Sequence, residues 1–396
     1  MLIEVITAIF FGILAGAICG LLPGIHINFV GAVLVSLSAF LMQFVSPIIL
    51  VIFIVSMAIS QTFIDFIPSV FLGAPDETTS LSVLPGHNLL KRGRGYEAVV
   101  FSSYGCLFAI PIILILSPIF IKYLPKFEEI INFFIPYILI FSSIFLISGE
   151  KKKLNALIVF ILSGFLGLAV LNTNVNQPFL PLLTGLFGAS SLILSIKNKV
   201  NISKQKIKKF QIKKTKLIKP LIASAFSSPL CCFLPGFGSG QAAVISASII
   251  NPPKREFLAM LGAINMIGIS LSFVVFYAIE KTRTGMAVNI FQIIKTLNLN
   301  NIIIIILTII FVSIISFYLT LYLTKIAARN IAEINYFKLS SITLIFISII
   351  VLAFSGIFGF FIFAISTATG IYGILSNVKR INLMGCLVVP VILFYL

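Results

Sequence analysis

The sequence has few charged residues and hardly any acidic ones. Of its 396 residues, 10% are charged and only 11 are Asp or Glu, whereas 59% are hydrophobic. Soluble globular domains carry roughly 25% charged residues, so this composition excludes a soluble protein. The two histidines and five cysteines show no Cys-x-x-Cys spacing, which argues against a zinc site and against a disulfide framework. We therefore expect no metal site and no cofactor.

The chain is built instead from long apolar runs. These runs do not alternate with polar residues, as the strands of a membrane barrel would, so they predict membrane-spanning helices. We expect an all-α polytopic membrane protein of the cell membrane, with about 10–12 transmembrane helices of which some are broken or re-entrant. The first run lacks a basic leader and carries Glu4, so we interpret it as a retained span. The runs lie near residues 2–22, 27–45, 48–67, 97–121, 130–148, 154–171, 179–196, 220–233, 241–251, 257–279, 300–324, 339–355, 358–376 and 381–395.

A basic segment divides the chain. Ten of the 28 Lys and Arg residues lie between Lys197 and Lys219. Basic loops stay on the cytoplasmic side of a membrane, so this segment predicts a topology anchor that contacts anionic lipid rather than a nucleic-acid partner. Counting back from this anchor places Lys151–Lys153 and Lys91–Arg94 inside, and the loops 122–129 and 172–178 outside. We predict a first transmembrane repeat at 1–196, a linker at 197–219 and a second repeat at 220–396.

A Leu-Pro-Gly motif occurs once in each part of the chain at matched positions. Residues 21–38 read LLPGIHINFVGAVLVSLS and residues 233–250 read FLPGFGSGQAAVISASII, an offset of 212. By the charge count, run 48–67 goes from outside to inside, and its counterpart 257–279 goes the other way. Equivalent segments in opposite directions are typical of the inverted-topology repeats of secondary transporters.

These motifs are candidate binding elements because Pro and Gly interrupt helices. A helix that restarts after such a break points free N–H groups and a partial positive charge at the break, which favours an anion. An ordinary membrane-helix kink is the alternative interpretation, since Pro and Gly are frequent there. The candidate substrate-binding residues are Pro23, Gly24, His26 and Asn28 in the first part, and Pro235, Gly236, Gly238, Ser239, Gly240 and Gln241 in the second.

A second polar cluster, GAPDETTSLSVLPGHNLLKRGRGYEA, covers residues 73–98. Pro75, Thr78, Thr79 and Ser80 are candidates for substrate contact. Asp76 and Glu77 are candidates for ion coupling, because hard cations prefer oxygen ligands. Asp65, in the run FIDFI, is a third candidate for ion coupling, since a carboxylate at membrane depth faces a cavity or a partner. A loop at the membrane surface is the alternative for the cluster, and a hydrogen-bonded structural histidine is the alternative for His26 and His87.

The combined pattern resembles the large permease subunit of the tripartite tricarboxylate transporters, in its compact archaeal branch. The matching positions are Pro23, Gly24, Gly73, Pro75, Ser80, Gly86, Lys91, Gly93, Pro235, Gly236 and Gly238. The resemblance implies uptake of di- or tricarboxylates by a two-repeat, elevator-like permease coupled to Na⁺ or H⁺. It also implies a small membrane subunit and an extracytoplasmic binding protein as partners, and we include a homodimer among the expected assemblies. Asp76 and Glu77 depart from the family pattern, and two carboxylates beside an anion site repel a carboxylate cargo unless they are protonated or paired with a cation.

Two other functions stay open on the residues alone. An intramembrane serine hydrolase would pair Ser239 with a histidine, and a passive anion channel would use the same polar groups in an open pore. Mirrored broken helices favour alternating access over a pore. We therefore predict a secondary active transporter of small organic anions, and not an enzyme.

Overall fold

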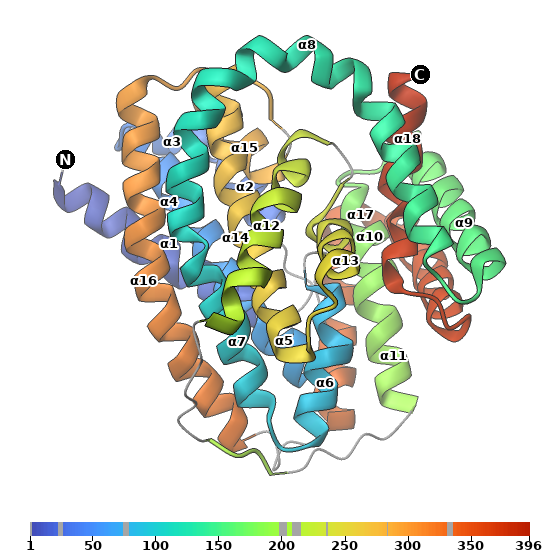
Figure 1. Ribbon diagram of the computed structural model, residues 1–396. Coiled ribbons are helices and arrows are strands. Elements are labelled where there is room, and N and C mark those ends of the chain that lie inside the picture. The colour runs from blue at the N-terminus through green and yellow to red at the C-terminus, as the bar shows by residue number, and fades with distance from the viewer. Residues whose placement is uncertain are drawn as a thin grey trace.

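The computed structural model describes residues 2–22, 27–73, 79–197, 204–207, 215–234, 237–282, 284–330 and 336–396. Within these ranges every regular element is a helix, as expected (Figure 1). The first elements are α1 Leu2–Leu21, α2 Ile27–Ser36, α3 Ser38–Leu41, α4 Pro47–Ile64, α5 Phe66–Phe71, η1 Ser80–Ser82, α6 Val83–Lys91, α7 Gly95–Phe108, α8 Ile110–Ser148 and α9 Lys153–Leu171. The later ones are α10 Phe179–Leu183, η2 Thr184–Ala189, α11 Ser190–Lys197, α12 Thr215–Phe233, α13 Ser239–Ile250, α14 Lys254–Ile279, α15 Gly285–Ile293, α16 Leu299–Asn330, α17 Tyr336–Leu375, η3 Arg380–Met384 and α18 Gly385–Tyr395.

Seven helical segments of the described chain are long and apolar enough to cross a bilayer. They are Leu2–Leu21, Pro47–Phe71, Gly95–Ser148, Lys153–Leu171, Lys254–Ile279, Leu299–Asn330 and Ser340–Leu375. Three shorter apolar segments, Phe179–Leu194, Ser239–Ile250 and Arg380–Tyr395, lie between or beside them. Large apolar side chains such as Phe10, Phe141 and Phe358 are exposed, and lipid is the solvent in which such surfaces are stable. The chain is a multi-pass membrane protein.

A single helix, α8, passes through residues 122–129, where a loop between the runs 97–121 and 130–148 was predicted. That prediction was wrong. α8 continues through this stretch and curves over one end of the molecule (Figure 1). Pro118, Pro125 and Pro136 lie inside it. A proline kinks a helix without necessarily ending it, because only one hydrogen bond is lost and the chain on either side can remain helical. The expected break between runs 339–355 and 358–376 is confirmed, because Gly356 inside α17 has a non-helical conformation (φ +67°) that divides it into two helices.

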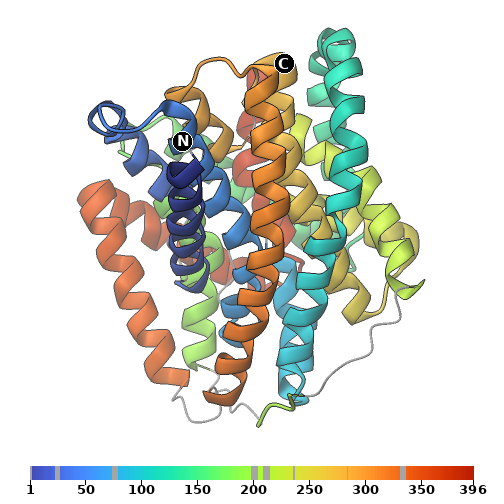
Figure 2. The same ribbon diagram turned by 90° about the vertical axis from the view of Figure 1, so that its left-hand side faces the viewer.

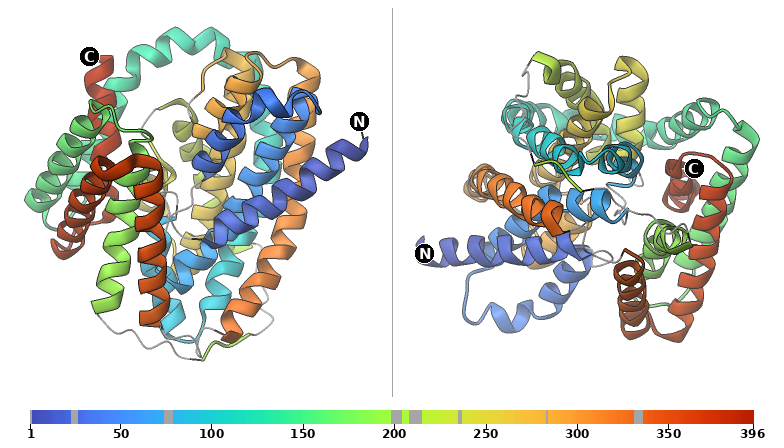
Figure 3. Two further views of the ribbon diagram at one scale, coloured as in Figure 1. Left: turned by 180° about the vertical axis from the view of Figure 1, so that it is seen from behind. Right: turned by 90° about the horizontal axis from the view of Figure 1, so that it is seen from below.

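The helices form two bundles that do not follow the two parts of the sequence. The larger core lies mainly among α1, α4, α5, α7, α8, α12, α14, α15 and α16. A smaller bundle joins α9, α10, η2 and α11 to α17, η3 and α18 around separate apolar clusters. Figure 1 shows the smaller bundle on the right, and the view from below in Figure 3 separates it in the same way. Each bundle therefore takes helices from both sides of the basic linker.

Glycines let the helices of the larger bundle approach closely. A Cβ placed on Gly105 of α7 would lie 1.8 Å from the carbonyl oxygen of Ala259 in α14. One placed on Gly262 of α14 would lie 2.2 Å from the carbonyl oxygen of Ser102 in α7. Small residues at the interface between membrane helices let the backbones touch. Such close packing stabilises the helix pair, because the hydrophobic effect does not drive helices together in lipid.

The helices that flank the two Leu-Pro-Gly motifs run in opposite directions. α1 and α4 descend in Figures 1 and 2, whereas α12 and α14 ascend. α1 ends at Leu21 and α2 begins at Ile27, while α12 ends at Phe233 and α13 begins at Ser239. Both the ends and the beginnings are 212 residues apart. After α13, Asn251 adopts a left-handed conformation (φ 43°) and two prolines follow, so the helix stops before α14 starts at Lys254.

Candidate functional site

Nine of the residues predicted for the site lie outside the described residues. They are Pro23, Gly24, His26, Pro75, Asp76, Glu77, Thr78, Pro235 and Gly236. Asn28 lies in the first turn of α2, and Ser80 begins η1. The remaining predicted residues are Asp65, Thr79, Gly238, Ser239, Gly240 and Gln241, and the structure describes the surroundings of each.

Asp65 lies at the junction between α4 and α5 and is 5% exposed. Thr79, just before η1, donates a hydrogen bond from Oγ1 to Asp65 Oδ2 at 3.2 Å. The hydroxyl of Ser69 lies 2.6 Å from Thr79 Oγ1 and 2.9 Å from the carbonyl oxygen of Asp65. One carboxylate and two hydroxyls thus converge at a buried point, and such an oxygen set suits a proton or a hard cation. Sequence reasoning missed Ser69, whose signal is its position four residues after Asp65 on the same helical face.

The helix that follows the second motif begins with buried polar residues. Gly238 is extended (φ −92°, ψ 172°) and its N–H donates to Oε1 of Gln241, so the Gln241 carboxamide caps its own helix. Ser239 and Gly240 in the first turn are buried as well. α13 has 12 residues, enough for a partial positive charge at this end.

The first turn of α13 packs against elements from both parts of the chain. A Cβ placed on Gly240 would lie 2.6 Å from Cδ1 of Ile381 in η3 and 3.8 Å from Cδ1 of Leu81 in η1. η1 and η3 also contact each other. We call this place, defined by Leu81, Gly240 and Ile381, the three-way junction. It brings the helix start after the second motif next to the polar cluster of the first part of the chain.

Two basic residues, His87 and Arg380, lie on elements that form the three-way junction or adjoin it. His87 of α6 has its Nδ1 3.1 Å from the carbonyl oxygen of Val70. Burial lowers the pKa of His87 below its usual 6.5, the positive charges of Lys91 and Arg380 lower it further, and the hydrogen bond with Val70 opposes them. Arg380 begins η3, and its buried Nη1 has no hydrogen-bond partner within the described ranges. Sequence reasoning missed Arg380, although Lys379 and Arg380 are the only charged residues between 339 and 396.

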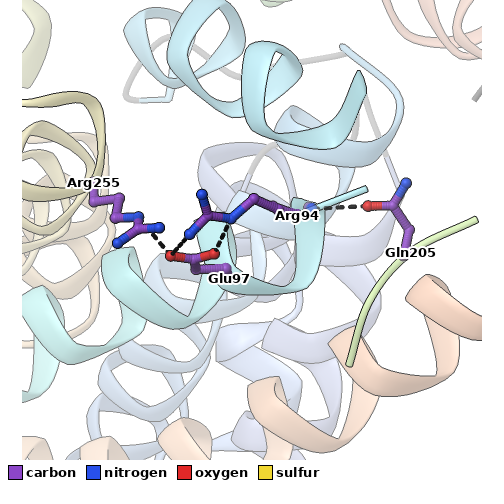
Figure 4. Close-up of polar contacts among 5 residues, drawn as sticks. Arg94, Glu97, Gln205 and Arg255 are labelled. Carbon is purple, nitrogen blue, oxygen red and sulfur yellow. Dashed lines mark hydrogen bonds and ion pairs between the residues drawn. The ribbon is translucent and has the colours of Figure 1, made fainter. Parts of the chain in front are cut away.

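A separate ionic cluster lies at the predicted cytoplasmic side (Figure 4). Glu97 of α7 is fully buried and accepts from Arg94 at 2.6 and 2.8 Å and from Arg255 of α14 at 2.5 Å. Gln205 of the basic segment accepts from the N–H of Gly95 at 2.8 Å and donates to the carbonyl of Leu90 at 3.1 Å. This cluster joins the two parts of the chain and the segment between them, and both arginines are already paired with Glu97, so we interpret it as structural.

The comparison with protein families covers nearly the whole chain. Residues 6–385 match the model described as "Tripartite tricarboxylate transporter TctA family". The chain is also 32% identical over 398 residues to "Uncharacterized protein MJ1079" of Methanocaldococcus jannaschii, with 97% of each chain covered. No solved structure matches it. A family match over this length agrees with the resemblance carried by the Leu-Pro-Gly motifs and with the archaeal branch expected from them. The chain belongs to the tripartite tricarboxylate transporter TctA family, a family of membrane permeases.

Proposed function

We propose that this protein is a secondary active permease for small organic anions, most simply di- or tricarboxylates, coupled to a Na⁺ or H⁺ gradient by alternating access. The observation that carries the proposal is the three-way junction, where the buried first turn of α13 meets η1. The helix start favours an anion. The Asp65 carboxylate with Thr79 and Ser69, directly before η1, favours a cation or a proton.

The proposed anion site at the start of α13 and the proposed cation or proton site at Asp65 both adjoin η1, which supplies a physical route for coupling. The Thr79 hydroxyl donates to Asp65, and the Thr79 carbonyl oxygen accepts a hydrogen bond at 2.7 Å from the hydroxyl of Ser82, the last residue of η1. A cation or proton that changes the charge at Asp65 would alter the hydrogen bond to Thr79. That change would pass through Ser82 to Leu81 and the first turn of α13. Coupling of this sort is a free energy shared between two sites through one connected element.

Alternating access is supported by the arrangement of the helices. The opposite directions of α1 and α12, and of α4 and α14, are what an inverted repeat requires. The division into two bundles with separate apolar cores supplies two bodies that can move against each other, as an elevator-like mechanism needs. Ala242 and Ala243 of α13 belong to the core of the larger bundle, whereas Ile381 of η3 belongs to that of the smaller one. Relative movement of the bundles would therefore open or close the junction between α13 and η3.

The family name also suggests partners. A tripartite system adds a small membrane subunit and an extracytoplasmic binding protein to the permease, and we propose the same assembly for this chain. The hydrolase alternative is less well supported, since His87 Nδ1 is directed at the carbonyl of Val70 and the family is one of transporters.

The test is uptake of labelled carboxylates into proteoliposomes that contain the purified protein. Succinate, citrate and butyrate would be offered under a Na⁺ gradient, under an H⁺ gradient, and with neither. We expect accumulation above the external concentration under one of the gradients. Equilibration without accumulation would indicate a channel. No carboxylate uptake under any condition, with and without added partner subunits, would refute the proposal.

A further inference from the structure

The guanidinium of Arg380, at the start of η3, has no role in the function proposed above. It lies in a stretch of the chain, residues 339–396, that has one other charged residue, the exposed Lys379. Nη1 of Arg380 is buried and has no hydrogen-bond partner in the part of the chain that the structure describes. A buried charged group without a partner is costly, because the hydration that it loses is not replaced.

The position of Arg380 is set by other polar groups that do not neutralise it. Oε1 of Glu150 accepts from the backbone N–H of Lys379 at 3.0 Å and from Nδ2 of Asn382 at 3.1 Å. Ser163 of α9 donates to the carbonyl oxygen of Asn382 at 3.3 Å. The carboxylate of Glu150 thus holds the backbone and the side-chain amide on either side of Arg380. These contacts hold η3 in place, and among the described residues none of them involves Nη1 of Arg380.

Arg380 lies next to a residue that contacts α13. Its neighbour Ile381 contacts the first turn of α13 at Gly240. Its charge also acts on His87 of α6, which lies in the polar cluster of the first part of the chain. The element that begins with Arg380 and the start of α13 therefore meet at the three-way junction. Arg380 carries a full positive charge and the start of α13 a partial one, so together they match an anion that carries more than one negative group.

Building on the proposed function, we infer that Arg380 binds a carboxylate group of the transported anion and that this contact selects di- or tricarboxylates over monocarboxylates. The planar guanidinium donates two parallel hydrogen bonds to one carboxylate, which a lysine cannot do. The N–H groups at the start of α13 are placed for a second carboxylate of the same molecule. A monocarboxylate can satisfy only one of these two positions.

The experiment compares Arg380→Gln and Arg380→Lys with the matched control Arg329→Gln, which removes an exposed cation at the end of α16. Binding of labelled succinate, citrate and butyrate is measured on purified protein, and the KM of uptake on proteoliposomes. We expect Arg380→Gln to weaken binding of succinate or citrate by at least about tenfold. The preference of Arg380→Gln for succinate or citrate over butyrate should also fall. The maximal rate of uptake by this variant should fall less than its KM rises. Arg329→Gln should match the wild type in all of these measurements.

The outcomes separate this inference from the proposed function. If the wild type binds and accumulates a dicarboxylate and folded Arg380→Gln does so with unchanged affinity and selectivity, the inference is wrong and the proposed function stands. If the wild type takes no carboxylate, both are wrong. If Arg380→Gln does not fold, Arg380→Lys provides the measurement. It keeps the charge but loses the paired hydrogen bonds, so its KM for succinate should rise, and an unchanged KM would overturn the inference.

Discussion

Thr79 Oγ1 donates a hydrogen bond to Asp65 Oδ2, which ties the start of η1 to the bend between α4 and α5. The two residues are 14 positions apart and both are buried. A buried carboxylate is stable only when it is hydrogen-bonded or paired with a cation. This contact places a titratable group next to the segment that forms the three-way junction.

Replacing Asp65 with Asn should remove the dependence of uptake on the coupling ion. The amide keeps the shape of the side chain but cannot bind a proton or balance a cation. We expect gradient-driven accumulation to fall by about tenfold or more, as the loss of one charged contact would cause, while exchange of labelled for unlabelled anion persists. Glu129→Gln, at an exposed position in α8, is the matched control. An Asp65→Asn protein with unaltered ion dependence would show that Asp65 plays no part in coupling.

Replacing Glu97 with Gln should destabilise the fold without changing substrate affinity. Two arginines, Arg94 and Arg255, would lose their common buried partner. Because both arginines are partly exposed, we expect a loss of about 1–3 kcal/mol rather than the larger cost of a fully buried pair. The thermal midpoint in detergent is the measurement. The control is Lys281→Gln, which breaks the half-exposed ion pair with Glu128 and should cost no more than about 1 kcal/mol of stability. Equal losses of stability in Glu97→Gln and Lys281→Gln would contradict the structural role of the Glu97 cluster.

Replacing Gly105 with Ala tests the close contact of α7 with α14. The added methyl group would meet the backbone oxygen of Ala259, which cannot move unless the helices separate. We expect a loss of about 3 kcal/mol or more, with reduced yield of folded protein on size-exclusion chromatography. Gly188→Ala in η2 has no neighbouring atom within 4 Å and should change stability by less than about 1 kcal/mol. A stable Gly105→Ala protein would show that the two helices do not pack at this distance.

The pH dependence of uptake above neutrality should not depend on His87. Burial, Lys91 and Arg380 lower its pKa below 6.5, so the imidazole is neutral at pH 7 and gains a proton only as the pH falls further. The ratio of uptake at pH 7 to uptake at pH 8 should therefore be the same in His87→Gln and in the wild type, within about twofold of rate. If His87→Gln lost a pH response that the wild type shows between pH 7 and pH 8, His87 would titrate in that interval and its pKa would not be lowered.

Much of the architecture was predictable because lipid imposes simple constraints. A chain that must satisfy its backbone hydrogen bonds inside a bilayer forms helices where apolar runs are long enough, and the runs at 2–22, 154–171 and 257–279 became α1, α9 and α14. The break near Gly356 followed from the gap between two runs. The loop expected at 122–129 was wrong, because charged residues and prolines there mark the membrane surface but do not end α8.

The candidate site was only partly visible before the fold was known. Asp65 and Thr79 were recognised as polar residues in apolar surroundings, and the structure joins them. Arg380 was not recognised, because a Lys-Arg pair between two apolar runs is the ordinary pattern of a membrane-surface anchor. Its interest comes from the buried Nη1 at the start of η3, an element that meets α13 through Ile381, and no local sequence pattern reports this burial.

Composition and the periodic return of apolar runs were enough to establish a helical membrane protein with two matched helix breaks, because transfer into lipid depends on each segment almost independently. Which polar groups meet depended on packing between segments far apart in the chain. Glycine contacts bring α7 against α14, and the two bundles each combine helices from both sides of the basic segment. Such contacts depend on shape complementarity across the whole molecule, and they place η1, η3 and the start of α13 at one junction.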